Sequence, residues 1–198
     1  LLSCSLLGGD TDAGTLFSED FSNNRKAWGT GKLDFGEVEV KDGEYIMRTS
    51  ASKYFIWGIP GKEFTNYRVE VTTRNTGSAT NVAFGLMCNF VDDYNYYFAG
   101  VSVDGYYAII RTQNDTDYVI SGDKINWVES DKIPINAPSY RLGLECVSGV
   151  ITLSVNGQML ESVSDSTFSS GDVGLFVFSF DQPTAEVRFD DLVVLPIA

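Results

Sequence analysis

The sequence contains no histidine, and this absence excludes several kinds of chemistry at once. A nucleophile activated by a Ser-His or Cys-His pair needs an imidazole base, and most zinc and copper sites use imidazole ligands. Cysteine is scarce as well. The three cysteines, Cys4, Cys88 and Cys146, are too far apart for a zinc knuckle or a Cys-x-x-Cys redox pair.

Basic residues are few: 14 Lys and Arg stand against 27 Asp and Glu, which gives a formal net charge of −13. Nucleic-acid affinity comes mainly from Lys and Arg releasing counterions, so this charge balance opposes a nucleic-acid partner. It equally opposes docking on anionic lipid through a basic patch. An acidic surface instead keeps an extracellular domain soluble and supplies oxygen ligands for calcium.

No segment approaches the roughly 20 apolar residues of a membrane-spanning helix, and apolar residues never recur at helical spacing for three turns. What the chain does contain is a series of short runs rich in Val, Ile, Tyr, Phe and Thr, separated by Gly, Asn, Asp and Pro. The expected strands span 43–49, 53–58, 67–74, 81–90, 94–103, 105–112, 117–121, 140–147, 150–156, 159–163, 172–180 and 185–195. About a dozen strands joined by hairpins predict an all-β protein, either a two-sheet antiparallel sandwich or a barrel.

The turns between these strands support the same interpretation. Asn156-Gly157 and Asp104-Gly105 are two-residue hairpin signals, because these residues readily adopt positive φ. The run 140–195 is the most regular part of the chain, whereas 114–138 is expected to hold one weak strand and a long loop.

The N-terminal residues Leu1-Leu2-Ser3-Cys4 resemble the end of a bacterial lipoprotein signal peptide, in which a small residue precedes the cysteine that becomes lipidated. The small, polar residues that follow fit a flexible tether. We therefore expect residues 1–14 to be a lipobox remnant and tether, and residues 15–198 to form one domain. The alternative is a frayed, mildly apolar end with an incidental cysteine.

The chain as a whole resembles the concanavalin A-like lectin/glucanase superfamily of laminin G-like jelly rolls, over roughly residues 15–195. The residues that carry the resemblance are 17–21 with Trp28, Tyr67-Arg68-Val69-Glu70-Val71, Phe84-Gly85-Leu86-Met87-Cys88, Asp92 to Phe98, Val155-Asn156-Gly157, Gly171 to Leu175 and Phe189 to Val194. Within that superfamily the chain looks like single-domain bacterial envelope lipoproteins of unknown function. The resemblance implies a concanavalin A-like β-sandwich. It does not imply one activity, since the fold serves binding modules, glycanases, adhesion domains and structural parts.

The resemblance also implies a structural calcium ion that joins the first strand to the last. The acidic residues at the matching places are Glu19, Asp20, Asp190 and Asp191. Calcium prefers several oxygen ligands, which carboxylates and loop carbonyls supply. The alternative is that Asp20 and Asp190 cap turns or pair with Arg25 or Arg188.

Glucanases of this superfamily carry their catalytic acids on one strand as Glu-x-Asp-x-(x)-Glu, and this chain has no such string. Retaining hydrolysis needs two carboxyls about 5 Å apart. The nearest approach is Glu37-Val38-Glu39, which lacks the intervening aspartate. The expectation is therefore a protein that is not an enzyme.

Aromatic residues offer a second kind of site, because sugars present apolar C–H faces to aromatic rings while Asn or Asp binds the hydroxyls. The candidate sugar-binding residues are Trp127, Tyr94, Tyr96, Tyr106, Trp57 and Asn95. Adjacent strand residues such as Tyr96 and Tyr97 point to opposite faces, so about half of these rings must belong to the core. The alternative for the whole set is core or sheet-face packing.

Cys88 and Cys146 both lie on the apolar face of their expected strands. In the envelope proteins that the chain resembles, cysteines tend to occur at both matching places, which implies a disulfide. The alternative is two buried free thiols.

These observations lead to one functional expectation with two competitors. We expect a non-catalytic, extracytoplasmic domain of the bacterial cell envelope, lipid-anchored at Cys4 or secreted, that binds a glycan. The alternative is a structural or accessory subunit that contacts another envelope protein, and a glycoside hydrolase is the third hypothesis. Association through unpaired edge strands is compatible with each of them.

Overall fold

The computed structural model describes residues 14–197, and in this range the chain forms strands and loops without a helix. The strands are β1 (Phe17–Glu19), β2 (Gly31–Leu33), β3 (Gly36–Lys41), β4 (Glu44–Thr49), β5 (Tyr54–Gly58), β6 (Glu63–Phe64), β7 (Tyr67–Asn75), β8 (Val82–Asp92), β9 (Asn95–Ser102), β10 (Tyr106–Gln113), β11 (Thr116–Val119), β12 (Val128–Glu129), β13 (Tyr140–Val147), β14 (Val150–Val155), β15 (Gln158–Ser164), β16 (Gly171–Ser179) and β17 (Ala185–Pro196). No helix in the described range is long and apolar enough to span a membrane.

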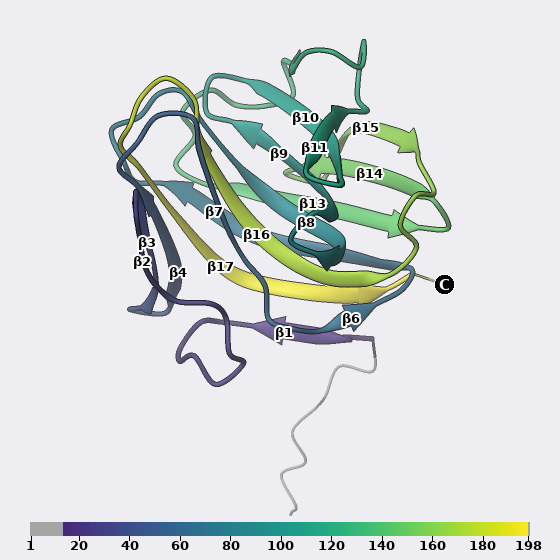
Figure 1. Ribbon diagram of the computed structural model, residues 1–198, viewed down its shortest axis with the longest axis horizontal. Helices are drawn as coiled ribbons and strands as arrows, with labels where there is room; N and C mark the ends of the chain where they lie inside the picture. The colour runs from purple at the N-terminus through teal and green to yellow at the C-terminus, as the bar shows by residue number, and fades with distance from the viewer. Residues whose placement is uncertain (1–13, 198) are drawn as a thin grey trace, which may run out of the picture.

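Two antiparallel sheets lie face to face (Figure 1). Sheet A has the order β15-β14-β13-β7-β17-β4-β3-β2, with β1 paired to β17. Sheet B has the order β11-β10-β9-β8-β16-β5, with β12 paired to β10 and β6 to β16. Strands distant in sequence are therefore neighbours: β17 lies between β7 and β4, and β16 lies between β8 and β5. This arrangement confirms the predicted two-sheet jelly-roll sandwich.

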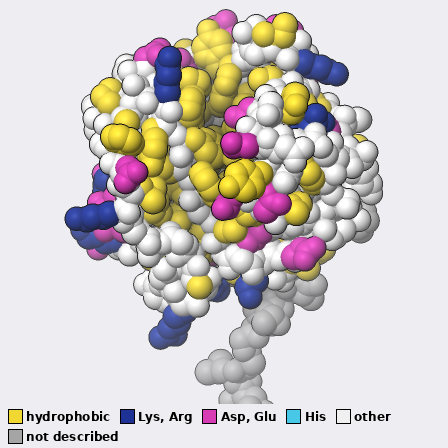
Figure 2. All heavy atoms as spheres, viewed as in Figure 1, with side chains coloured by type: hydrophobic (Ala, Val, Ile, Leu, Met, Phe, Trp, Pro, Cys, Tyr) yellow, Lys and Arg dark blue, Asp and Glu magenta, His cyan; other side chains and the backbone are white. Residues whose placement is uncertain are grey.

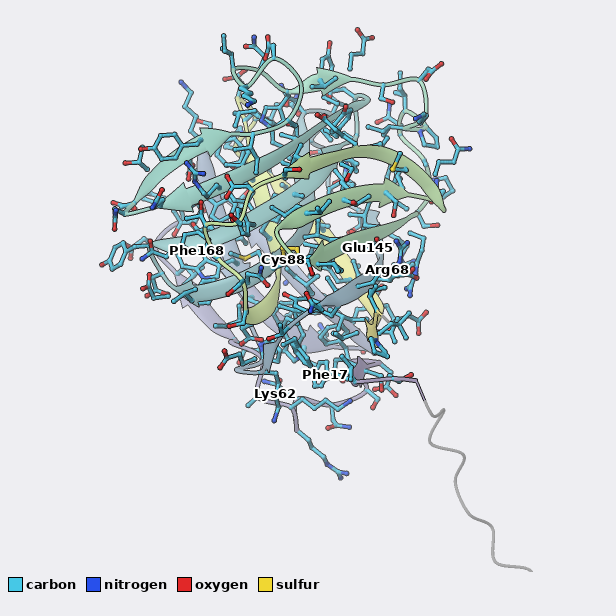
Figure 3. All side chains as sticks on the ribbon, turned by 90° about the vertical axis from the view of Figure 1, so that its right-hand side faces the viewer. Phe17, Lys62, Arg68, Cys88, Glu145 and Phe168 are labelled. Atoms are coloured by element: carbon cyan, nitrogen blue, oxygen red, sulfur yellow. A yellow bond between two sulfur atoms is a disulfide. The ribbon has the colours of Figure 1, made fainter. Side chains whose placement is uncertain are left out.

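Alternation along each strand places the core between the sheets. In β7, Tyr67, Val69 and Val71 are fully buried. The intervening Arg68 points outward, where its guanidinium forms ion pairs of 2.6 Å with Glu70 and with Glu145 of β13 (Figure 3). Each fully buried aliphatic side chain contributes roughly 1.5–3 kcal/mol to folding. The burial of every second side chain between the sheets is therefore the main contribution that holds them together.

Of the two predicted hairpin turns, Asn156-Gly157 has positive φ at both residues, whereas in Asp104-Gly105 only Gly105 does, at 99°. Asn156 and Gly157 have φ values of 50° and 78° in the turn between β14 and β15. Asp42 and Gly43, with φ values of 55° and 79°, join β3 to β4 in the same way. Positive φ at both central residues matches the twist of the flanking strands, so these turns determine the register of their hairpins.

One covalent bond links the sheets. Cys88 of β8 in sheet B is bonded to Cys146 of β13 in sheet A, across 58 residues of sequence (Figure 3). Both cysteines are buried in the core. The disulfide implied by the family resemblance is thus confirmed, and the alternative of two free thiols is wrong.

Five strands were not among the predicted ranges: β1, β2, β3, β6 and β12. β6 and β12 have only two residues each, and they form because a neighbouring strand offers backbone partners. Such pairings depend on tertiary contacts that a local pattern does not contain. The predicted lipobox with Cys4, and nearly all of the predicted tether, lie outside the described residues.

Candidate functional site

The outer face of sheet B is unusually apolar for a surface. In β9, Tyr97 and Ala99 point into the core between the sheets, while Tyr96 and Phe98 point to the opposite face. The prediction that adjacent tyrosines divide between the two faces holds at this strand. A second hydrophobic cluster, separate from the main core, therefore lies on the outside of sheet B.

Two glycines deepen this outer face. Gly85 of β8 and Gly100 of β9 are direct partners across the two strands. A Cβ atom on either residue would lie 2.2 Å from a neighbouring carbonyl oxygen and 2.8 Å from the ring of Phe176. The absence of side chains thus allows Phe176 of β16 to lie flat against the sheet, where it is completely buried.

Further rings pack on Phe176 and form the floor of a hollow. Phe55 of β5 stacks on Phe176 with ring centroids 5.3 Å apart, and Phe98 meets the same ring edge-on at 5.2 Å. Phe178 and Ile110 extend this apolar floor. The hollow has a volume of about 470 Å³, and we call it the groove. Figure 2 shows hydrophobic side chains gathered in a hollow on this face, with acidic side chains beside it.

Two tryptophans and a tyrosine provide the ring surfaces of the groove. Trp57 is 36% exposed and lies 6.5 Å from the ring of Tyr96, with 30° between the ring planes. Trp127, in the loop before β12, also lines the groove and packs edge-on against Phe180 at 5.4 Å. Because Trp127 is half-buried, it is less exposed than its position in an irregular loop suggests. Its ring is held in place by this packing.

The polar part of the groove comes from two hairpin tips. Asp93 belongs to the β8–β9 turn, while Asp115 and Asp117 belong to the β10–β11 hairpin. The tips are joined, because the Asn114 amide donates to the Asn95 side chain at 3.2 Å. The three aspartates are exposed and form the rim at one end of the groove.

Thr112 and Tyr96 lie beside this acidic rim. The Thr112 hydroxyl donates to the Asp117 carboxylate at 2.7 Å. Burial raises the pKa of the Tyr96 phenol, a hydrogen bond with Thr112 lowers it, and the negative charges of the three rim aspartates raise it further. All three carboxylates thus act on the same end of the groove.

The groove contains three of the six predicted sugar-binding residues. Trp57, Tyr96 and Trp127 line it. Tyr94 is 57% exposed at the β8–β9 turn and does not line it, and neither does Tyr106, at the far end of β10. The Asn95 amide is held by the Asp92 carboxylate at 2.8 Å.

Sequence reasoning missed the rim aspartates and the phenylalanine floor. Asp93, Asp115 and Asp117 are separated in sequence, and they meet only because two hairpin tips pack together. Phe55 and Phe178 are direct partners on the β5–β16 pair, although they are more than 120 positions apart in sequence. The available signal was the Asp-rich composition of both hairpin turns beside aromatic strands.

The carboxylates considered for hydrolysis lie elsewhere. Glu37 and Glu39 project from β3 in sheet A and pair with Arg48 at 3.6 and 2.6 Å. Burial raises the pKa of Asp172 to about 6, against hydrogen bonds from backbone amides including that of Lys62. A general acid needs a raised pKa of this kind, but Asp172 does not line the groove.

The predicted calcium ligands lie on neighbouring strands. β1 pairs with β17, so that Glu19 is opposite Leu192. One Glu19 oxygen accepts from the Phe21 amide at 3.0 Å, while the other is buried without a partner. Burial raises the pKa of Asp190, its hydrogen bond from the Asp191 amide lowers it, and nearby acidic residues including Asp20 raise it again.

The orphaned Glu19 oxygen and the negative charge around Asp190 are features that a cation would relieve. However, residues 14–197 contain no group of three or more His, Cys, Asp or Glu side chains placed to hold a metal ion. The Asp20 carboxylate accepts from the Ser22 amide at 3.0 Å, as the turn-capping alternative predicts. The calcium site stays a prediction.

The sequence matches no family model. It also matches no curated protein. Solved structures, by contrast, share its fold. The carbohydrate-binding module CBM66 from Bacillus subtilis is similar with a TM-score of 0.66 and 18% identity, over 85% of this chain and 94% of that one.

Two further structures show the range of proteins with this fold. The β-glucanase of Bacillus licheniformis is similar with a TM-score of 0.63 and 10% identity, over 94% of this chain and 100% of that one. A protein of unknown function with a galectin-like fold from Bacillus subtilis has a TM-score of 0.60 and 12% identity, over 91% of this chain and 95% of that one. The concanavalin A-like jelly-roll fold is therefore shown, and it is shared by a binding module and a glycanase.

Proposed function

We propose that this protein is a non-catalytic glycan-binding module whose binding site is the groove on sheet B. The observation that carries the proposal is the pairing of exposed aromatic surface with three carboxylates in one hollow. Sugar rings have apolar C–H faces that pack on Trp57 and Trp127, and their hydroxyls donate hydrogen bonds to carboxylates such as Asp117. A groove of about 470 Å³ has room for a few sugar units.

Two further features support a binding role over hydrolysis. The acidic residues that line the groove come from hairpin tips, whereas the outward-facing residues of β8, β9 and β16 beneath it are Gly, Met, Phe and Tyr. The fold is also that of a carbohydrate-binding module from Bacillus subtilis. A hydrolase would release reducing ends from a polysaccharide panel, and we expect none.

The test is a glycan array followed by calorimetry on each glycan that binds. Trp57→Ala and Trp127→Ala should each weaken binding by about tenfold or more, because each removes a ring that packs on the sugar. Tyr94→Ala is the matched control, since it removes an exposed aromatic ring outside the groove, and it should leave affinity unchanged. Failure to bind any glycan, or equal affinities for all three variants, would refute the proposal.

We propose further that the domain works outside the cytoplasm, on a bacterial cell envelope, and that a lipid on Cys4 holds it there. The Cys88–Cys146 disulfide supports an oxidising compartment. Cys4→Ala in the precursor should move the protein from the membrane fraction to the soluble fraction. If wild type and variant fractionate alike, the lipid anchor is wrong.

Calcium is proposed as a structural ion between β1 and β17, with Glu19, Asp20, Asp190 and Asp191 as the candidate ligands. Calcium at millimolar concentration should raise the melting temperature, and Asp190→Asn should abolish the increase. An equal effect of magnesium would indicate nonspecific screening instead.

A second candidate function is that of an accessory subunit that contacts another envelope protein. The loop 120–138 favours it, because Ile125 and Ile135 are 74% and 67% exposed. In-cell crosslinking from position 125 should then yield one defined adduct. A purely glycan-binding module should yield none.

A further inference from the structure

Acidic side chains line the groove, and no basic side chain in the lining neutralises their charge. Its lining includes Asp93, Asp115 and Asp117 but no Lys or Arg. The nearest arginine in sequence, Arg111 of β10, points to the other side of the strand, where it pairs with Asp165 and lies 4.9 Å from the Tyr118 ring centroid. The rim carboxylates therefore keep their negative field in the groove, on a protein whose net charge is already −13.

The aromatic surfaces of the groove favour the same kind of ligand. The face of a tryptophan or tyrosine ring attracts a cation through its quadrupole. Trp57 offers an exposed face at the groove, its ring lies 6.5 Å from that of Tyr96, and the charges of the three aspartates act on the Tyr96 phenol. Aromatic faces and carboxylates thus act together on one end of the hollow.

From this charge complementarity we propose that the groove selects glycans that contain positively charged amino sugars, with the ammonium group at the end formed by Asp93, Asp115 and Asp117. This inference rests on the proposed glycan-binding function and specifies its ligand class. The sugar ring packs on the tryptophans, while the ammonium group donates hydrogen bonds to the rim. Uronic-acid and sulfated glycans are disfavoured, because their charges would face three carboxylates of the same sign.

The sharpest test compares two probes with the same sugar backbone, one with free amines that carry positive charge and one with neutral acetylated amines. A glucosamine tetrasaccharide with free amines and its fully N-acetylated form share ring shape, linkage and length. We expect the free-amine form to bind about tenfold more tightly at low ionic strength, because each exposed ion pair contributes modestly and three carboxylates act together. The preference should shrink in 0.5 M NaCl, since exposed charges are screened.

Variants assign the preference to the rim. Asp115→Asn with Asp117→Asn keeps side-chain shape and should reduce the preference to within about twofold, because it weakens binding of the free-amine form much more than binding of the N-acetylated form. Asp34→Asn, in the exposed β2–β3 turn of sheet A, is the matched control and should retain the full preference.

The outcomes separate this inference from the broader proposal. If both tetrasaccharides bind equally in wild type, or if the Asp115/Asp117 double variant keeps the preference, the amino-sugar inference is wrong while the glycan-binding function stands. If neither these probes nor any glycan on the array binds, the proposed function falls together with the inference. Tighter binding of an oligouronate than of the free-amine probe would also overturn the amino-sugar inference.

Discussion

Arg48 of β4 and Glu186 of β17 form an ion pair of 2.6 Å on the outer face of sheet A. Glu186 also accepts hydrogen bonds from Arg188 at 2.7 Å and from the Thr76 hydroxyl at 2.7 Å. Strands β4 and β17 and the residue that follows β7 are therefore connected through one carboxylate. Sheet A exposes this ionic network where sheet B exposes aromatic rings, so the two outer faces of the sandwich have opposite character.

Glu186→Gln should lower the free energy of unfolding by about 1–2 kcal/mol at pH 7, because it leaves the partly buried guanidinium of Arg48 without one of its charged partners. Burial alone would raise the pKa of Glu186, but hydrogen bonds from Arg48, Thr76 and Arg188 lower it to about 2. Its stabilising effect is therefore present above the unfolded pKa of about 4.5 and is lost as pH falls toward 2. Urea unfolding of both proteins between pH 2 and 7 should show their difference shrinking toward the acid end. A constant difference would contradict it.

Asp172 predicts a pH dependence of the opposite sign. Burial raises its folded pKa to about 6 from 3.8, so between these values the folded state binds more protons than the unfolded state. Stability due to Asp172 is then present below pH 3.8 and is lost as pH rises through 6. Between pH 3.8 and 6, the free energy of unfolding of the wild type should fall relative to that of Asp172→Asn. Near pH 5 the slope of this difference against pH should correspond to about one proton. Parallel curves for the two proteins would refute the assignment.

Removing the disulfide should destabilise the sandwich strongly. Replacing Cys88 and Cys146 by alanine opens a loop of nearly 60 residues in the unfolded chain, which predicts a loss on the order of 4 kcal/mol. Denaturant unfolding measures this loss. A reductant should lower the stability of the wild type toward that of the double variant and leave the variant unaffected. Equal midpoints for the oxidised wild type and the variant would contradict the structural role.

Even the smallest side chain at position 100 is predicted to lower the stability of the fold. Gly100→Ala places a Cβ atom 2.2 Å from the Phe84 carbonyl oxygen and 2.8 Å from the Phe176 ring, so the strand or the ring must move. We expect a destabilisation of about 1–3 kcal/mol in thermal or urea unfolding, and weaker binding in the groove. Gly29→Ala is the control, because no atom lies within 4 Å of its added Cβ. If the two variants are equally stable, the packing of Phe176 is not as constrained as described.

The strands that could be predicted are those in which the local pattern and the tertiary environment agree. β7 alternates Val69 and Val71 with Arg68 and Glu70, and its burial follows that alternation residue by residue. β3 has the same alternation in Glu37, Val38 and Glu39 but was not predicted as a strand. Its charged residues are acceptable there because Arg48 of the next strand neutralises them, a contact that β3 alone does not reveal.

The groove likewise combines features that the sequence could predict with features that it could not. Tyr96 could be separated from Tyr97 by strand periodicity, yet periodicity does not say which face is the core and which is the groove. That choice depends on sheet A, which covers Tyr97 but not Tyr96. The rim is still less local, because Asp93 joins Asp115 and Asp117 only through the packing of two hairpins.

The sequence by itself determined an acidic, histidine-free, all-β sandwich, since composition, period-two alternation and turn residues act over a few neighbouring positions. It also carried, through its family resemblance, the pairing of Cys88 with Cys146. Only the tertiary structure decided that Gly85 and Gly100 make room for Phe176, and that aromatic and acidic side chains from β5, β9, β11, β16 and the turns beside them meet in one groove. These residues come together because strand order in the sheets differs from strand order in the chain, and a local pattern contains no information about that order.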